Sequence, residues 1–117
     1  MRTSLIVIML LSLGFTAVGQ VKEVTMHGEI VDVIAFVSSG AKQDAATIRA
    51  SATSGNPLGF HETSTGKLYL LGSPEMNKSA NEMVQSYVGL RVFVKGKTYN
   101  RDGTDVVLIT DIGKSIR

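Results

Sequence analysis

Apolar and polar residues alternate over several stretches of the chain after residue 20, the pattern of β-strands with one buried face. The first stretch, Val24–Val37, is long and rich in β-branched side chains. Met26 and Ile30 belong to one phase of its alternation. Val31 and Val33 belong to the other phase. We therefore expect one long, bent strand with a β-bulge near Val31 and Asp32 that exchanges the buried face.

Two hairpins are predicted in the second half of the chain. In the first, two apolar stretches within 58–70 flank a turn-forming segment at 63–66. In the second, two strand-like runs within 90–112 meet at Asp102 and Gly103, a dipeptide that favours a tight hairpin turn. Together with the first strand, these hairpins make five strands.

Between the hairpins the apolar period becomes helical. Ser79 is a suitable N-cap, Glu82 follows it three residues later as in a capping box, and Gly89 is a suitable end. We expect a short helix here. The apolar side chains that share its predicted face are Met76, Met83, Val84, Tyr87 and Val88.

The order of elements is strand, long connection, hairpin, helix, hairpin. It predicts an all-β domain with one short helix, placed between the third and fourth strands. The same order occurs in the OB-fold, a five-stranded Greek-key barrel that binds oligonucleotides or oligosaccharides. We therefore expect an OB-fold-like barrel, and an open antiparallel sheet with one packed helix is the alternative.

A long polar segment, residues 36–56, separates the first strand from the first hairpin. Beyond Val37, Ile48 is its only aliphatic side chain larger than alanine. Asp44 is a suitable N-cap for a short, weakly held helix that ends before Gly55. Loops of this length inside a compact domain are usually functional or disordered. We consider two interpretations, a polar crossover that covers one end of the barrel and a lid or docking element beside a binding face.

The N-terminal segment has the pattern of a secretory signal peptide. Arg2 precedes an apolar run at 5–13, and small residues up to Gly19 are spaced for a signal peptidase. The apolar stretch is shorter than the ~20 residues of a spanning helix, so a membrane anchor is the weaker interpretation. We expect a signal peptide over 1–19, a single domain over 20–117 without a membrane span, and a periplasmic or extracellular location.

The composition removes several kinds of chemistry. The chain has no cysteine, which excludes disulfides, thiol catalysis and thiolate metal ligands. Removal of Arg2 with the signal lowers the formal net charge from +2 to +1. A general electrostatic attraction to nucleic acid or anionic lipid is therefore not expected.

Several strand and turn motifs carry a resemblance to a known group of proteins. They are "HGEIVDV", "GAK", "GNPLG", "GKLYLLG" and "YVGLRVFVKGKTYNRDG". In these motifs the chain resembles small, exported, largely uncharacterised bacterial OB-fold proteins. The resemblance implies the scaffold and no enzymatic activity. Cysteines of such proteins stand at positions that match Ala35, Thr47 and Ser51 here, so any metal, haem or disulfide chemistry does not carry over to this cysteine-free chain.

The most distinctive chemical pattern lies in the predicted fourth strand, residues 91–101. Basic and aromatic residues alternate there with other residues, so a period of two places them on one face. Cations and flat rings on one face suit an anionic or sugar-like ligand. The alternative is a solvated outer face of an ordinary half-buried strand. With two neighbours on the predicted third strand, the candidate ligand-binding residues are Lys67, Tyr69, Arg91, Phe93, Lys95, Lys97 and Tyr99.

The two histidines raise a second hypothesis. His27 lies two residues before Glu29 on one strand face, and pairing of the first two strands would bring His61 near them. Two imidazoles and a carboxylate would make a minimal zinc or copper site. No short ligand motif supports this site, and surface histidines are the simpler interpretation. We therefore assign no metal and no other cofactor, and keep these three residues as weak metal candidates.

No nucleophile, base and carboxylate combine into a recognisable catalytic motif, so no catalytic residue is assigned. We expect a monomeric, non-enzymatic binding or accessory module outside the cytoplasm. Its partner would be an anionic or oligosaccharide-like ligand or an envelope protein, and nucleic acid is not expected. The alternatives are a metal-binding periplasmic domain and an interaction subunit of an envelope complex.

Overall fold

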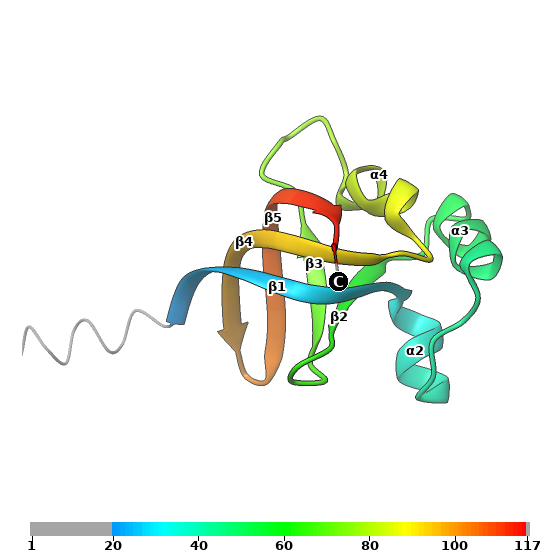
Figure 1. Cartoon of the computed structure of the whole chain (residues 1–117), viewed down its shortest axis with the longest axis horizontal. Helices are drawn as coiled ribbons and strands as arrows, with labels where there is room; N and C mark the ends of the chain where they lie inside the picture. The colour runs from blue at the N-terminus through cyan, green and yellow to red at the C-terminus, as the bar shows by residue number, and fades with distance from the viewer. Residues whose placement is uncertain (1–19, 117) are drawn as a thin grey trace, which may run out of the picture.

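In the computed structural model, which describes residues 20–116, five strands form a closed barrel with three short α-helices and one 3-10 turn (Figure 1). The strands are β1 (Gln20–Asp32), β2 (Leu58–Glu62), β3 (Leu68–Gly72), β4 (Arg91–Arg101) and β5 (Thr104–Lys114). The helices are α2 (Val33–Ser39), α3 (Ala45–Thr53) and α4 (Ala80–Val84), and α4 continues into the 3-10 turn η1 (Gln85–Tyr87). The predicted signal peptide, residues 1–19, lies outside the described residues.

The strands follow one another around the barrel in the order β1-β2-β3-β5-β4, and β4 pairs with β1 to close it. The β3–β5 pair is parallel and the other four pairs are antiparallel. The expected five-stranded barrel is present, and the alternative of an open sheet is wrong. The expected helix between the third and fourth strands is α4. Within 20–116 no helix is long and apolar enough to span a membrane.

The expectation of a single helix is wrong, because the connection between β1 and β2 contains α2 and α3. Asp32 caps α2 by accepting a hydrogen bond from the Ala35 N–H. Asp44 caps α3, as predicted, by accepting from the Thr47 N–H at 2.8 Å. Each capping side chain satisfies a backbone donor that the first turn of a helix cannot pair. The β-branched residues after Asp32 are therefore helical rather than extended.

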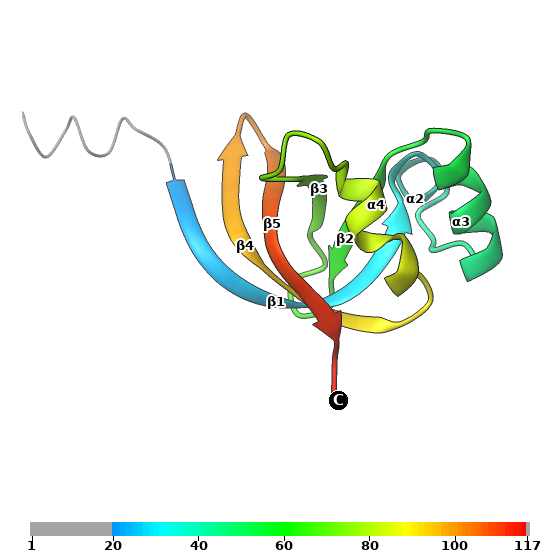
Figure 2. The same ribbon diagram turned by 90° about the horizontal axis from the view of Figure 1, so that it is seen from above.

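β1 bends strongly and pairs with a different strand on each side of the bend (Figure 2). It pairs with β4 over residues 20–29 and with β2 over residues 28–32. Gly28 lies in both pairings, and a Cβ atom placed there would be 2.0 Å from the His61 carbonyl oxygen. Only glycine lets the two backbones approach this closely.

The predicted bulge near Val31 and Asp32 is wrong, since β1 runs in continuous register with both partners. The phase change has another cause. Ile30 and Val31 point to opposite faces of the strand, yet each is only 1% exposed. Ile30 belongs to the barrel core, whereas Val31 lies opposite Gly59, over which the Val33 side chain of α2 packs. Both faces of β1 are buried here, so the strand needs no bulge to bury both phases.

The sheet's one register shift lies elsewhere, between β4 and β5. Lys95 pairs with Asp111 and Gly96 pairs with Ile109, which leaves Thr110 as the extra residue of β5. A Cβ atom at Gly96 would be 2.2 Å from the Leu108 carbonyl oxygen. Glycine therefore permits this bulge.

The core fills the barrel and extends to the end covered by α3 and α4, which lie near each other in Figures 1 and 2. Ile48 of α3 is 1% exposed, and Arg49 donates a hydrogen bond to the Val88 carbonyl at 3.0 Å. The connection is thus anchored to the core rather than weakly held, which favours its interpretation as a cover. The buried hydrophobic cluster consists of Met26, Ile30, Ile48, Ala52, Leu58, Phe60, Tyr69, Val84, Val88, Val92, Val94, Val107 and Ile109.

The helix between β3 and β4 confirms its predicted cap, because Ser79 accepts from the Glu82 N–H at 3.1 Å. Val84 and Val88 are buried, as expected. Met76 is fully exposed, so its predicted place on the buried face is wrong. It lies before the helix begins, outside the helical period.

Both predicted hairpins are present. β2 and β3 flank residues 63–67, and β4 and β5 turn at Asp102 and Gly103, which both have positive φ. Positive φ at both central positions is the geometry of the tight turn that this dipeptide favours.

Candidate functional site

The outer face of β4 shows the predicted alternation. Val92 and Val94 are buried in the barrel, whereas Arg91, Lys95 and Lys97 are exposed on the opposite face. Phe93, on the same outer face, is only half-buried. Its ring covers the β5 backbone, because a Cβ atom added at the facing Gly113 would be 2.5 Å from it.

Carboxylates of the neighbouring strands lie opposite the lysines of this face. In the strand register, Lys97 faces Glu23 of β1 and Lys95 faces Asp111 of β5. Directly opposed residues of opposite charge attract one another across a sheet. This part of the face is therefore of mixed charge, which supports the interpretation of Lys95 and Lys97 as a solvated surface.

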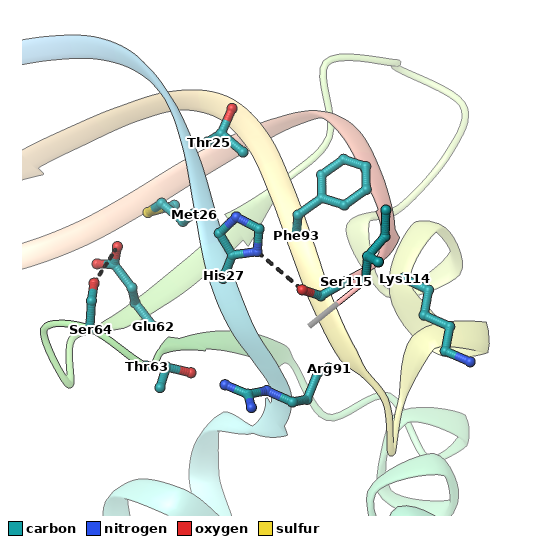
Figure 3. A pocket seen from close by; sticks show the side chains of 11 residues that line it. Thr25, Met26, His27, Glu62, Thr63, Ser64, Arg91, Phe93, Lys114 and Ser115 are labelled. Atoms are coloured by element: carbon teal, nitrogen blue, oxygen red, sulfur yellow. Dashed lines mark hydrogen bonds between the residues drawn. The ribbon is translucent and has the colours of Figure 1, made fainter.

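Beside β1 the surface is hollowed into a cleft of about 720 Å³ (Figure 3). Its walls come from β1, the start of the β2–β3 turn, β4 and the end of β5. Figure 3 shows the Arg91 guanidinium directed to the side where Thr63 lies, while the Lys114 side chain extends away. The cleft is lined by Thr25, Met26, His27, Glu62, Thr63, Ser64, Arg91, Phe93, Lys114, Ser115 and Ile116.

A second cleft, of about 300 Å³, opens where β1 diverges from the β2–β3 hairpin. It is lined by Lys22, Val24, Thr25, Met26, Glu62, Lys67, Tyr69, Thr98, Tyr99, Asn100 and Asp105. The two clefts share Thr25, Met26 and Glu62, so they adjoin at this part of β1. We call the two clefts together the β1 groove.

The β1 groove gathers five of the seven predicted ligand-binding residues and leaves two outside. Lys95 and Lys97 line neither cleft. Arg91 and Phe93 line the larger cleft, and Lys67, Tyr69 and Tyr99 line the smaller one.

The acids of the β1 groove already accept hydrogen bonds from their neighbours. Glu62 accepts from the Ser64 and Thr65 hydroxyls at 3.3 and 2.7 Å. Asp105 accepts from the Asn100 amide at 2.8 Å. These carboxylates are thereby held in the hairpins that carry them.

The cations of the β1 groove have no such partners. Over residues 20–116 a single ion pair is formed, between Lys42 and Glu29. Glu29 lies opposite Arg91 in the register of β1 and β4, and would be its natural partner. Glu29 is paired with Lys42 instead, and Arg91 lines the larger cleft. Lys42 belongs to the polar connection between α2 and α3, so this connection also contacts β1.

Sequence reasoning missed Lys22, Thr25 and Glu62 as groove residues. No pattern in the sequence marks them, because the clefts depend on how far β1 bends away from the β2–β3 hairpin.

The Tyr69 side chain is almost fully buried at the smaller cleft. Burial raises the pKa of the Tyr69 phenol, and the nearby Glu62 and Asp105 carboxylates raise it further. Tyr69 therefore presents a neutral hydroxyl beside Lys67.

The structure assigns both histidines to ordinary contacts. The His61 ring packs against Phe36 of α2 with ring centroids 4.7 Å apart. His27 Nδ1 lies 3.3 Å from the Ser115 hydroxyl. Glu29 lies opposite His61, but among residues 20–116 no three His, Asp or Glu side chains are grouped to hold a metal ion. The weak candidates His27, Glu29 and His61 therefore do not form a three-ligand site.

The chain matches no protein-family model, no curated protein and no solved structure. The resemblance to exported bacterial OB-fold proteins stays a prediction. What the chain binds is therefore inferred from the β1 groove.

Proposed function

We propose that this chain is an exported, non-enzymatic binding module of OB-fold type, which holds an anionic ligand in the β1 groove. The barrel order, the parallel β3–β5 pair and the position of α4 support the OB-fold assignment. The N-terminal pattern supports export.

One observation carries the proposal: the groove presents cations without ion-pair partners, while its acids are already hydrogen-bonded. The groove is lined by Lys22, Lys67, Arg91 and Lys114, and none of them is within ion-pair distance of a carboxylate among residues 20–116. Glu62 and Asp105 accept hydrogen bonds from their own hairpins. An anion entering the groove thus meets four cations without ion-pair partners and two carboxylates, a net positive charge.

The arginine and the lysines would act differently on such an anion. The planar guanidinium of Arg91 can donate two parallel hydrogen bonds to a carboxylate, sulfate or phosphate. The ammonium groups of Lys22 and Lys67 act as point charges. The half-buried ring of Phe93 and the phenol of Tyr99 supply flat surfaces for the uncharged part of the ligand.

Matched charge reversals test the proposal. Arg91→Glu and Lys67→Glu change groove residues, whereas Lys95→Glu and Lys97→Glu change the same charge on the mixed-charge surface. Binding of fluorescent polyglutamate and of alginate is measured by anisotropy at low and high salt. We expect the groove variants to bind at least about tenfold more weakly and the surface variants to stay within about twofold.

Equal losses in all four variants would show a general charge effect and would contradict a groove-specific site. Binding unchanged by Arg91→Glu and Lys67→Glu would also overturn the proposal. Thermal unfolding of each variant shows that the fold is retained.

A further inference from the structure

One edge of β1 is open along the groove. Residues Gln20–His27 pair with β4 on one side, and on the other side no strand within 20–116 pairs with them. The β2 strand joins this edge only from Gly28 onward. We call Gln20–His27 the free-edge half of β1.

The hydrogen bonds identify which backbone groups face the open side. The His27 carbonyl accepts from the Thr63 N–H at 3.0 Å, so the backbone groups of His27 point toward the β2–β3 hairpin. Because these directions alternate along a strand, the N–H and C=O groups of Glu23 and Thr25 point the same way. Those of Lys22 point toward β4, as shown by the 3.4 Å bond that its carbonyl accepts from the Thr98 hydroxyl.

There is room for another backbone beside these groups. Both clefts include Thr25 and Met26 of the free-edge half and Glu62 at the end of β2. The groove therefore runs along the open edge, where β1 and the hairpin separate beyond the Gly28–Glu62 pair. A strand that entered here would extend the sheet beyond β1.

We propose that the ligand of the β1 groove is an extended acidic segment of a partner protein, which adds as a strand to the free-edge half of β1. Its backbone pairs with Glu23 and Thr25, and its carboxylates reach Lys67 and Arg91. This inference rests on the proposed function and names its ligand. Main-chain pairing supplies affinity in such strand addition, and side-chain contacts supply specificity.

Charge and backbone chemistry favour this occupant over two others. A second copy of this chain would bring Glu23, Glu62 and Asp105 to the interface together with the cations, so its charges complement the groove less well than those of an acidic segment. An acidic glycan would satisfy the cations but has no amide ladder to pair with Glu23 and Thr25. An acidic peptide offers carboxylates to the cations and backbone amides to Glu23 and Thr25.

The test uses a synthetic acetylated peptide of alternating Glu and Val, as long as the free-edge half. Thr25→Pro removes the one N–H that faces the open side at that position, without removing a donor to β4. Thr25→Val is its matched control, since it keeps the N–H and changes only the hydroxyl. Affinity is measured by titration calorimetry, and the fold of each variant by circular dichroism and thermal unfolding.

We expect Thr25→Pro to bind the peptide at least about tenfold more weakly than Thr25→Val does. A peptide with N-methyl groups on alternate residues makes the same test from the ligand side, so the inference stays testable even if Thr25→Pro does not fold. Two such peptides are needed, one methylated at the odd and one at the even positions, and one of them should not bind. A peptide of alternating Lys and Val should not bind either.

The outcomes separate the two proposals. Suppose that Arg91→Glu weakens peptide binding, whereas Thr25→Pro and both N-methylated peptides leave the affinity unchanged. Strand addition is then overturned while the anion site stands. If no affinity for the Glu and Val peptide is measured although alginate binds, strand addition is likewise overturned. If Arg91→Glu and Lys67→Glu leave all of these affinities unchanged, the proposed function itself fails.

Discussion

The two halves of β1 belong to one continuous strand but have opposite surroundings. Residues Gly28–Asp32, the buried half, pair with β2, and Ile30 and Val31 are 1% exposed on opposite faces. The free-edge half pairs with β4 alone, and Thr25 and His27 are exposed. The comparison shows that one strand can close the barrel with its C-terminal half and still offer unpaired backbone groups along its N-terminal half.

The curvature of β1, which changes partners at Gly28, separates the two halves. It brings β1 against β2 on one side and lets β1 diverge from the hairpin on the other. The groove is thus a consequence of closing a small barrel with one long strand. Substitutions in the two halves should accordingly affect different properties.

The largest effect should come from Gly28→Val. The added Cβ atom would be 2.0 Å from the His61 carbonyl oxygen, so β1 and β2 must separate. We expect a loss of about 3 kcal/mol or more in the free energy of unfolding, measured by urea denaturation. Thr25→Val in the free-edge half should change it by about 0.5 kcal/mol or less. An unchanged urea midpoint in Gly28→Val would contradict the role given to this contact.

A pair of identical substitutions sharpens the comparison. Val31→Ala removes two methyl groups from a fully buried site and should cost about 2 kcal/mol of unfolding free energy. Val24→Ala, in the free-edge half, removes the same groups from a half-buried site and should cost less than about 1 kcal/mol. Similar losses in denaturant unfolding would show that the two halves do not differ in burial.

The strands, hairpin turns and helix caps could be predicted because their signals are local. Alternation marks β4, the Asp102–Gly103 dipeptide marks its turn with β5, and a capping box marks α4. The prediction of a bulge near Val31 was wrong, because a change in the phase of the apolar alternation can have two causes. One is an inserted residue, and the other is burial of both faces of a regular strand. Only the packing of α2 shows which of them applies.

Only the part of the candidate site that depends on alternation along one strand could be predicted from the sequence. Period two correctly placed Arg91, Lys95 and Lys97 on one face of β4. It could not show that Glu23 and Asp111 face the two lysines, because these pairings depend on strand register and, for Asp111, on the bulge at Thr110. Nor could the alternation predict the β1 groove, which depends on how far β1 bends away from the β2–β3 hairpin.

A smaller effect should follow from Lys42→Ala. Loss of this ammonium frees Glu29 to pair with Arg91, the facing residue in the register. We expect binding of the Glu and Val peptide to weaken about two- to fivefold, because Arg91 is exposed and Glu29 only half-buried, so that an ion pair between them is weak.

A double-mutant cycle isolates this competition from the loss of a positive charge. In a Glu29→Gln background the same lysine substitution should change the peptide affinity by less than about twofold. An equal loss with and without Glu29→Gln would show that Lys42 acts only through its own charge.

Amide hydrogen exchange along β1, with and without the Glu and Val peptide, tests the central claim most directly. In the free protein, the N–H groups of Glu23 and Thr25 should exchange rapidly, while those of Val24 and Met26, which face β4, should be protected. Saturation with the peptide should slow Glu23 and Thr25 by at least about tenfold. Exchange at these two residues that is already slow in the free protein, or that is unchanged at saturation, would contradict the account.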